Sequence, residues 1–238
     1  MTDVFFKQGS LVMSSEPIPP VAEDVVWTGD PVNRVLVVVS VLLILFTLKA
    51  FIQILPSLRE CLFFGRGTLD LEHSVSKARL RNISALSFAF PFFLIADRFA
   101  LLRFGFAAAW PPRLSLPLTA GFFLAYVLLR RLLFAVFGPR HTDYDGRQAT
   151  HNTLYSFFVL LCTAMLITLL FIGVFDLQAG TVRLILAAEI AFFYLFAMFR
   201  TVQVLASRCR AFSVILFFFV LELVPAAAAV TAYLRFCS

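Results

Sequence analysis

The sequence has few charged residues and lacks the short motifs by which common catalytic and metal sites are recognised. Charged residues make up 14% of the 238 residues, roughly half of their share in ordinary soluble domains. The four cysteines are scattered, with no CxxC or Cys/His spacing, so neither a zinc site nor a disulfide framework is expected. HExxH, a nucleotide-binding loop and the paired aspartates of intramembrane proteases are also missing. We therefore expect no cofactor, no metal and no catalytic residues.

Most of the chain consists of long apolar runs. Hydrophobic residues make up 61% of the chain, and six runs of about 20 residues follow residue 34, each long enough to cross a bilayer as a helix. The sequence therefore predicts an all-α membrane protein, a single bundle of about six transmembrane helices over residues 35–238. The predicted spans are 35–55, 82–104, 116–137, 154–175, 182–205 and 211–234.

Prolines and charges mark the ends of the first two spans. Pro56 is expected to close the first span. The second span contains Pro91 and then the pair Asp97-Arg98. Two interpretations stay open: the helix stops near Asp97, or a kinked and tilted helix continues to about Ala109.

The first 34 residues form a separate acidic segment. Residues 1–33 carry five Asp and Glu against the single Lys7, with Pro-Ile-Pro-Pro at 17–20. This pattern predicts a disordered tail and not a cleavable signal peptide, which needs a basic end directly before an apolar core.

The basic residues predict the orientation. Twelve Lys and Arg follow the first, third and fifth spans, against seven on the other side. Since cytoplasmic loops are enriched in Lys and Arg, both termini are predicted to be extracytoplasmic. The basic residues that give the net charge of +6 lie next to apolar runs. This position indicates contact with anionic membrane lipids and not with nucleic acid.

Two carboxylates lie at membrane depth. Glu189 is about eight residues into the fifth span and Glu222 about twelve residues into the sixth. An ionised acid there is costly unless it is paired, hydrated or protonated. It could serve a proton or cation relay, or a hydrogen bond that holds the bundle together.

Further polar residues accompany these acids. Arg200 lies eleven residues after Glu189, on nearly the same side of a helix, and Gln203 shares that side. This seam should face protein, with Arg200 near the cytoplasmic end, where it can extend to the interface. Pro225, three residues after Glu222, predicts either a hinge beside the acid or a bend that permits close packing.

The remaining polar candidates are weaker. Asp97-Arg98 could form a local pair with Arg103 or with a partner at the outer surface, but an interfacial cluster with no chemical role is favoured. His141, Asp143, Asp145 and His151 are expected in one cytoplasmic loop, where a solvated turn is favoured over a metal site.

The last third of the chain resembles a known family. Phe193-Tyr194-Leu-Phe-Ala-Met-Phe-Arg200, Arg210-Ala-Phe-Ser-Val-Ile-Leu and Leu221-Glu222-Leu-Val-Pro225 are similar to segments of an uncharacterised polytopic inner-membrane family of the Bacteroidota, a domain of unknown function. The resemblance covers mainly residues 150–236. It implies a bacterial cytoplasmic membrane and points to Glu222 and Pro225, but it implies no activity.

Two functional hypotheses follow. The first is a non-enzymatic scaffold or accessory subunit of a bacterial envelope assembly, which contacts a membrane-protein partner or a second copy of itself through its helices. The alternative is a small proton-linked transporter that uses Glu189 and Glu222.

Overall fold

The structure, a computed structural model, describes five long helices. It covers residues 27–207 except 28, 65–66, 68–69, 72, 102–114, 138–143 and 176, together with the single positions 214, 219, 224, 227 and 231. The acidic tail up to residue 26 and nearly all of the predicted sixth span, including Glu222 and Pro225, lie outside the described residues. The helices are α2 (Pro31–Phe63), α4 (Val75–Arg98), α5 (Ser115–Phe137), α6 (Tyr144–Phe175) and α7 (Ala179–Ala206).

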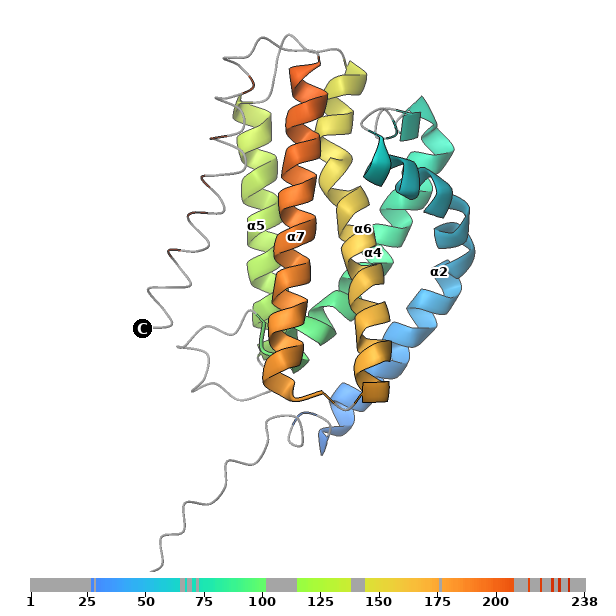
Figure 1. Ribbon diagram of the computed structural model, residues 1–238, viewed down its shortest axis with the longest axis vertical. Coiled ribbons are helices and arrows are strands. Elements are labelled where there is room, and N and C mark those ends of the chain that lie inside the picture. The colour runs from blue at the N-terminus through green and yellow to red at the C-terminus, as the bar shows by residue number, and fades with distance from the viewer. Residues whose placement is uncertain are drawn as a thin grey trace, which may run out of the picture.

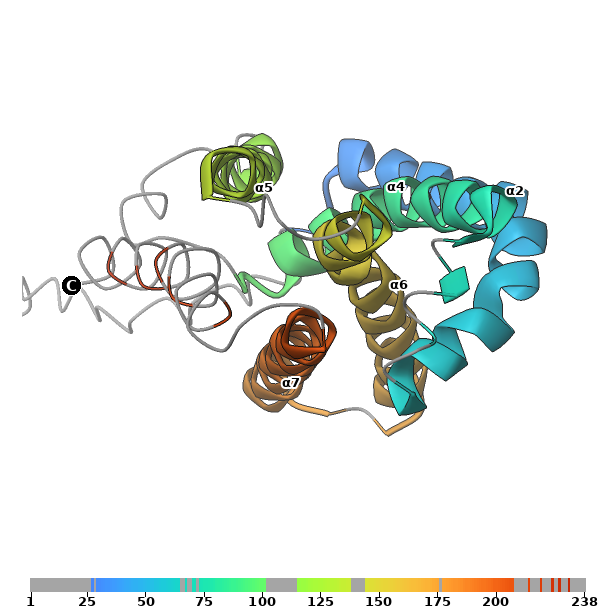
Figure 2. The same ribbon diagram turned by 90° about the horizontal axis from the view of Figure 1, so that it is seen from above.

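All five helices are long and apolar enough to cross a membrane. They run alternately up and down, and α6 lies between α4 and α7 in both views (Figures 1 and 2). The fold class predicted from the sequence, an all-helical multi-span bundle, is confirmed to this extent. The expected count of about six spans rests on residues 211–234, most of which are not described.

Helix α4 is at the centre of the described bundle. Half of its most apolar window is buried, against 6% for α2, and it packs against α2, α5 and α6. Phe92 and Phe93 of α4 meet Phe123 of α5 and Phe158 of α6, with ring centroids 5.2–5.8 Å apart. This aromatic cluster joins three helices, and the offset and edge-on contacts between its rings are favourable.

Helix α2 contacts α4 through one narrow seam. Buried and half-buried residues recur every three or four positions, as in helices that pack at a shallow angle. They are Ser40, Ile44, Thr47, Phe51, Ile54, Leu58 and Cys61.

Pro56 does not end α2 as expected. The helix continues through Pro56 to Phe63, and α2 bends in its upper half in Figure 1. A proline removes one hydrogen bond and kinks a helix, but neighbouring helices can support the turns beyond it. Here Ser57, Leu58 and Cys61, directly after the proline, are buried, so packing holds the last two turns in place.

The second span also differs from the predicted 82–104. Helix α4 begins at Val75 and ends at Arg98, so the interpretation in which the helix stops near Asp97 is correct. The end is a Schellman motif: the Leu101 amide donates to the Ala96 carbonyl at 2.9 Å, and Ala100 to Asp97 at 3.1 Å. Ala100 occupies the left-handed position with φ 49°, which glycine usually fills.

Candidate functional site

Glu189 lies on the face of α7 that packs against α6. Its Oε1 accepts a hydrogen bond from the Thr168 hydroxyl of α6, whereas its Oε2 is buried with no hydrogen-bond partner among the described residues. It is ten residues beyond the start of α7, about 15 Å along the axis. A carboxylate at this depth is thus tied to a neighbouring helix through one oxygen only.

Thr168 differs from other threonines of the bundle in where its hydroxyl donates. Thr153, Thr163 and Thr201 each donate to the carbonyl four residues earlier in their own helix, at 2.7–2.9 Å, the usual local bond of a helical threonine. Thr168 donates across the interface to Glu189 instead. A hydrogen bond to a carboxylate is stronger than one to a neutral carbonyl, which explains the preference.

Arg200 is buried at the other end of α7. Its side chain is 8% exposed, so other parts of the protein cover the guanidinium that was expected to extend toward the interface. Nη2 donates to the main-chain carbonyl of Leu62 at 2.6 Å, and Nη1 donates to Gln203 Oε1 at 2.7 Å. The guanidinium also lies 5.3 Å from the centroid of the Phe196 ring, within cation–π range.

Glu189 and Arg200 share a side of α7, as predicted, but they do not meet. Eleven residues of helix separate them by about 16 Å along the axis. Arg200 and Gln203 are brought together, whereas Glu189 is paired with Thr168. Between them, the same side carries Phe193, Phe196 and Ala197, which are buried or half-buried. On this side of α7 the two polar contacts are therefore separated by an apolar stretch. A third polar contact between helices, from the Tyr126 hydroxyl of α5 to the Tyr194 hydroxyl of α7 at 3.1 Å, lies on another side of the helix.

Asp97 and Arg98, at the end of α4, contact a residue that the sequence analysis did not consider. Trp27 Nε1 donates to Asp97 Oδ2 at 2.9 Å, and the Arg98 guanidinium lies 5.7 Å from the Trp27 ring centroid and 5.3 Å from that of Phe99. The Trp27 carbonyl accepts from the Asn33 side chain at 3.0 Å. Tryptophan is enriched at membrane interfaces, which is the signal that could have identified Trp27.

Two more buried arginines were also missed, since both were counted as orientation signals. Arg81 in α4 is 0% exposed and donates through Nε and Nη2 to Asn82 Oδ1. Arg130 in α5 is 5% exposed and donates to the His151 carbonyl of α6 at 3.4 Å. The pattern of α4 could have located Arg81, because it falls within a series of buried positions spaced three and four apart. That series is Ala78, Arg81, Ala85, Phe88, Phe92 and Ile95.

The expected loop of His and Asp residues is partly helical. Asp145 and His151 lie within α6, which begins at Tyr144, while His141 and Asp143 are outside the described residues. The His151 ring is 5.1 Å from that of Phe134 in α5, and its Nδ1 lies 3.0 Å from Asn152 Oδ1. Among the residues that are described, no group of three or more His, Cys, Asp or Glu could hold a metal ion.

Comparison of the chain with models of protein families, with curated proteins and with solved structures finds no match.

Proposed function

We propose that this chain is a non-enzymatic integral membrane protein that acts as a scaffold or accessory subunit of a bacterial envelope assembly. It would hold its partner through contacts between helices inside the membrane. The proposal includes a sixth span over residues 211–234, an inner-membrane location and extracytoplasmic termini, as the basic connections and the resemblance over residues 150–236 favour.

The proposal rests on the contacts that the polar side chains of α7 make with neighbouring helices. Arg200 joins α7 to the end of α2, and Glu189 joins α7 to α6. An ion or proton path needs polar or hydrated groups in succession. Phe193, Phe196 and Ala197 lie between the two contacts on the same side of α7, and this favours a structural role for both.

The outward side of α2 supports a role in binding a membrane-embedded partner. Within the part of the chain that the structure describes, α2 packs mainly along its seam toward α4, with smaller contacts to α6 and to Arg200 of α7. The rest of the helix presents large apolar side chains. Either lipid tails or the helix of another protein can cover such a surface. The exposed residues include Val35, Val38, Leu42, Leu45 and Phe46.

Crosslinking in the native membrane tests this proposal. A photo-reactive residue replaces Phe46, which is 85% exposed on α2, and in a matched control it replaces Leu170, which is 71% exposed on α6. We expect one protein to crosslink at position 46 and to co-purify in fixed stoichiometry in mild detergent. Lipid adducts alone at both positions, together with a particle that contains no second protein, would contradict the scaffold.

One observation favours the alternative, a proton-linked transporter. Glu189 Oε2 is buried without a hydrogen-bond partner among the described residues, and an unpartnered carboxylate oxygen within a transmembrane helix is typical of ion and proton pathways. In proteoliposomes a transporter moves protons or a solute without any partner. Glu189→Gln and Glu222→Gln then abolish flux at unchanged protein levels, whereas Glu60→Gln, at an exposed position of α2, does not.

Cysteine labelling tests the orientation. In a cysteine-free background, a single cysteine at position 10 should react with a membrane-impermeant reagent added from the extracytoplasmic side. Labelling only from the cytoplasmic side would reverse the assignment.

A further inference from the structure

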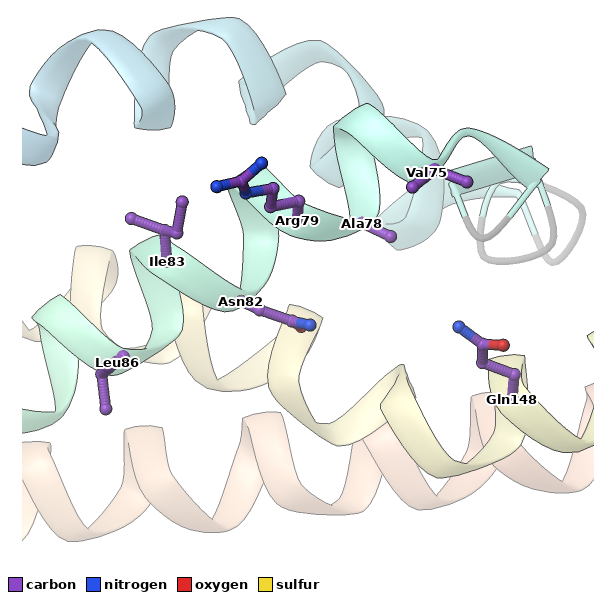
Figure 3. Close-up of a pocket in the computed structure, with 7 residues that line it drawn as sticks. All are labelled: Val75, Ala78, Arg79, Asn82, Ile83, Leu86 and Gln148. Atoms are coloured by element: carbon purple, nitrogen blue, oxygen red, sulfur yellow. The ribbon is translucent and has the colours of Figure 1, made fainter.

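A groove opens between the first turns of α4 and α6, with a volume of about 410 Å³. Arg79 and Asn82 line it from α4, and Gln148 lines it from α6. In Figure 3 the Asn82 side chain points from α4 toward Gln148. None of the described lining residues is acidic, and Arg79 brings a full positive charge.

The buried Arg81 orients the amide of Asn82. Arg81 donates two hydrogen bonds to Asn82 Oδ1, from Nε at 3.2 Å and from Nη2 at 3.0 Å. Since the carbonyl oxygen of the amide is used by Arg81, the remaining group of Asn82 is its NH₂, a donor only. The polar part of the groove thus offers the amide donors of Asn82 and Gln148. The guanidinium of Arg79 points away from them in Figure 3, but its side chain is exposed and can rotate toward them to complete a set of donors that suits an anion.

The apolar part of the groove continues along α4. Val75 and Ala78 line its first turn, and Ile83 and Leu86 follow one and two turns later. Ile83 is 40% and Leu86 78% exposed, so both face outward, where a membrane helix meets acyl chains. One side of α4 is therefore polar and positively charged near the start of the helix and apolar over the turns that follow.

We propose that this groove binds an anionic phospholipid. Its phosphate lies against Arg79, Asn82 and Gln148, and one acyl chain runs along Ile83 and Leu86. A free phosphate would use only the polar half, whereas a lipid uses both. Basic sites between transmembrane helices at the membrane surface recognise anionic headgroups in this manner. The site is independent of whether the protein is a scaffold or a transporter.

Native mass spectrometry of the full-length, delipidated protein in detergent tests the site. The protein is titrated with phosphatidylglycerol and, separately, with phosphatidylcholine of the same chains. We expect at least one phosphatidylglycerol to bind selectively, and Arg79→Gln to weaken that binding about fivefold, the effect of one basic residue near an anionic surface. Arg131→Gln is the matched control, an exposed arginine at the same end of the bundle on α5.

A second variant keeps the test clear if Arg79→Gln changes the fold. Val75 is 82% exposed and is the first residue of α4, where a glutamate is favourable for the helix. Val75→Glu should therefore fold and repel the headgroup, with a larger loss of binding than Arg79→Gln. Equal weakening by Arg79→Gln and Arg131→Gln would overturn the proposal in favour of diffuse surface charge. Full competition by inorganic phosphate at similar concentration would also overturn it, because the lipid chain would then contribute nothing.

Discussion

Arg200 of α7 donates a hydrogen bond to the main-chain carbonyl of Leu62 in α2, at 2.6 Å and across 138 residues of sequence. Leu62 belongs to the last turn of α2, where four carbonyls have no partner within the helix and the helix dipole is negative. The arginine therefore both satisfies the carbonyl and complements the charge of the helix end. The bend at Pro56 precedes this turn, so the proline and the arginine act on the same segment.

Arg200→Ala should lower the free energy of unfolding by about 2 kcal/mol, because it leaves the partly buried Leu62 carbonyl without its donor. Thermal or denaturant unfolding in detergent measures the change. Arg183→Ala, at an exposed arginine in the second turn of α7, should stay within about 0.5 kcal/mol of the wild type. Equal stability of the two variants would mean that the contact with Leu62 contributes nothing.

Gln203 provides a second test of the same contact. Gln203→Ala combined with Arg200→Ala in a double-mutant cycle should give a coupling free energy of about 1 kcal/mol, since the two side chains share a 2.7 Å hydrogen bond. Additive effects would show that Arg200 is held by Leu62 and Phe196 alone.

The helices could be predicted from hydropathy because long apolar runs carry that signal directly. Their ends could not, since they depend on contacts between distant residues. Pro56 is a strong local signal for a helix end, yet the burial of Leu58 and Cys61 carries α2 past it. At Ala100 the opposite happens: the helix ends in a left-handed residue although the sequence offers no glycine or asparagine there.

The candidate site was predicted in part. Helical spacing correctly placed Glu189 and Arg200 on the bundle side of α7, since that argument needs only one helix, whereas Gln203 is exposed and contacts Arg200 of its own helix. The partners Thr168, Leu62 and Trp27 lie on other segments, and one sequence contains no information on how those segments pair. Counting arginines as orientation signals also hid Arg81 and Arg130, whose burial follows from the side of the helix they occupy.

Ala100→Gly should stabilise the protein by roughly 1 kcal/mol, since an L-residue at positive φ costs about 1–2 kcal/mol that glycine avoids. The matched control is Ala89→Gly in the interior of α4, where glycine should destabilise by about 1 kcal/mol. Unfolding in detergent should thus show that the two Ala→Gly substitutions change the free energy of unfolding in opposite directions. Two destabilising results would contradict the Schellman end of α4.

Thr168→Val should destabilise the bundle by about 1 kcal/mol, because it removes the hydroxyl that donates to Glu189 between α6 and α7. Thr163→Val is the control on the same helix, since its hydroxyl donates to its own backbone and its loss should be nearly neutral. A difference between the two variants under the same unfolding conditions measures the contribution of the contact between helices. If both are neutral, Glu189 is not held by Thr168 and its role in joining α6 to α7 fails.

Trp27→Phe should loosen the start of α2. The substitution keeps an aromatic ring for Arg98 but removes the indole N–H that donates to Asp97, a loss of about 1 kcal/mol. Hydrogen exchange at the first turn of α2, after Pro31, should then be about fivefold faster, with little change in the centre of α6. Asp97→Asn keeps an acceptor oxygen for the indole and should exchange nearly as slowly as the wild type. Unchanged exchange in Trp27→Phe would show that Asp97 does not hold the beginning of α2 against the end of α4.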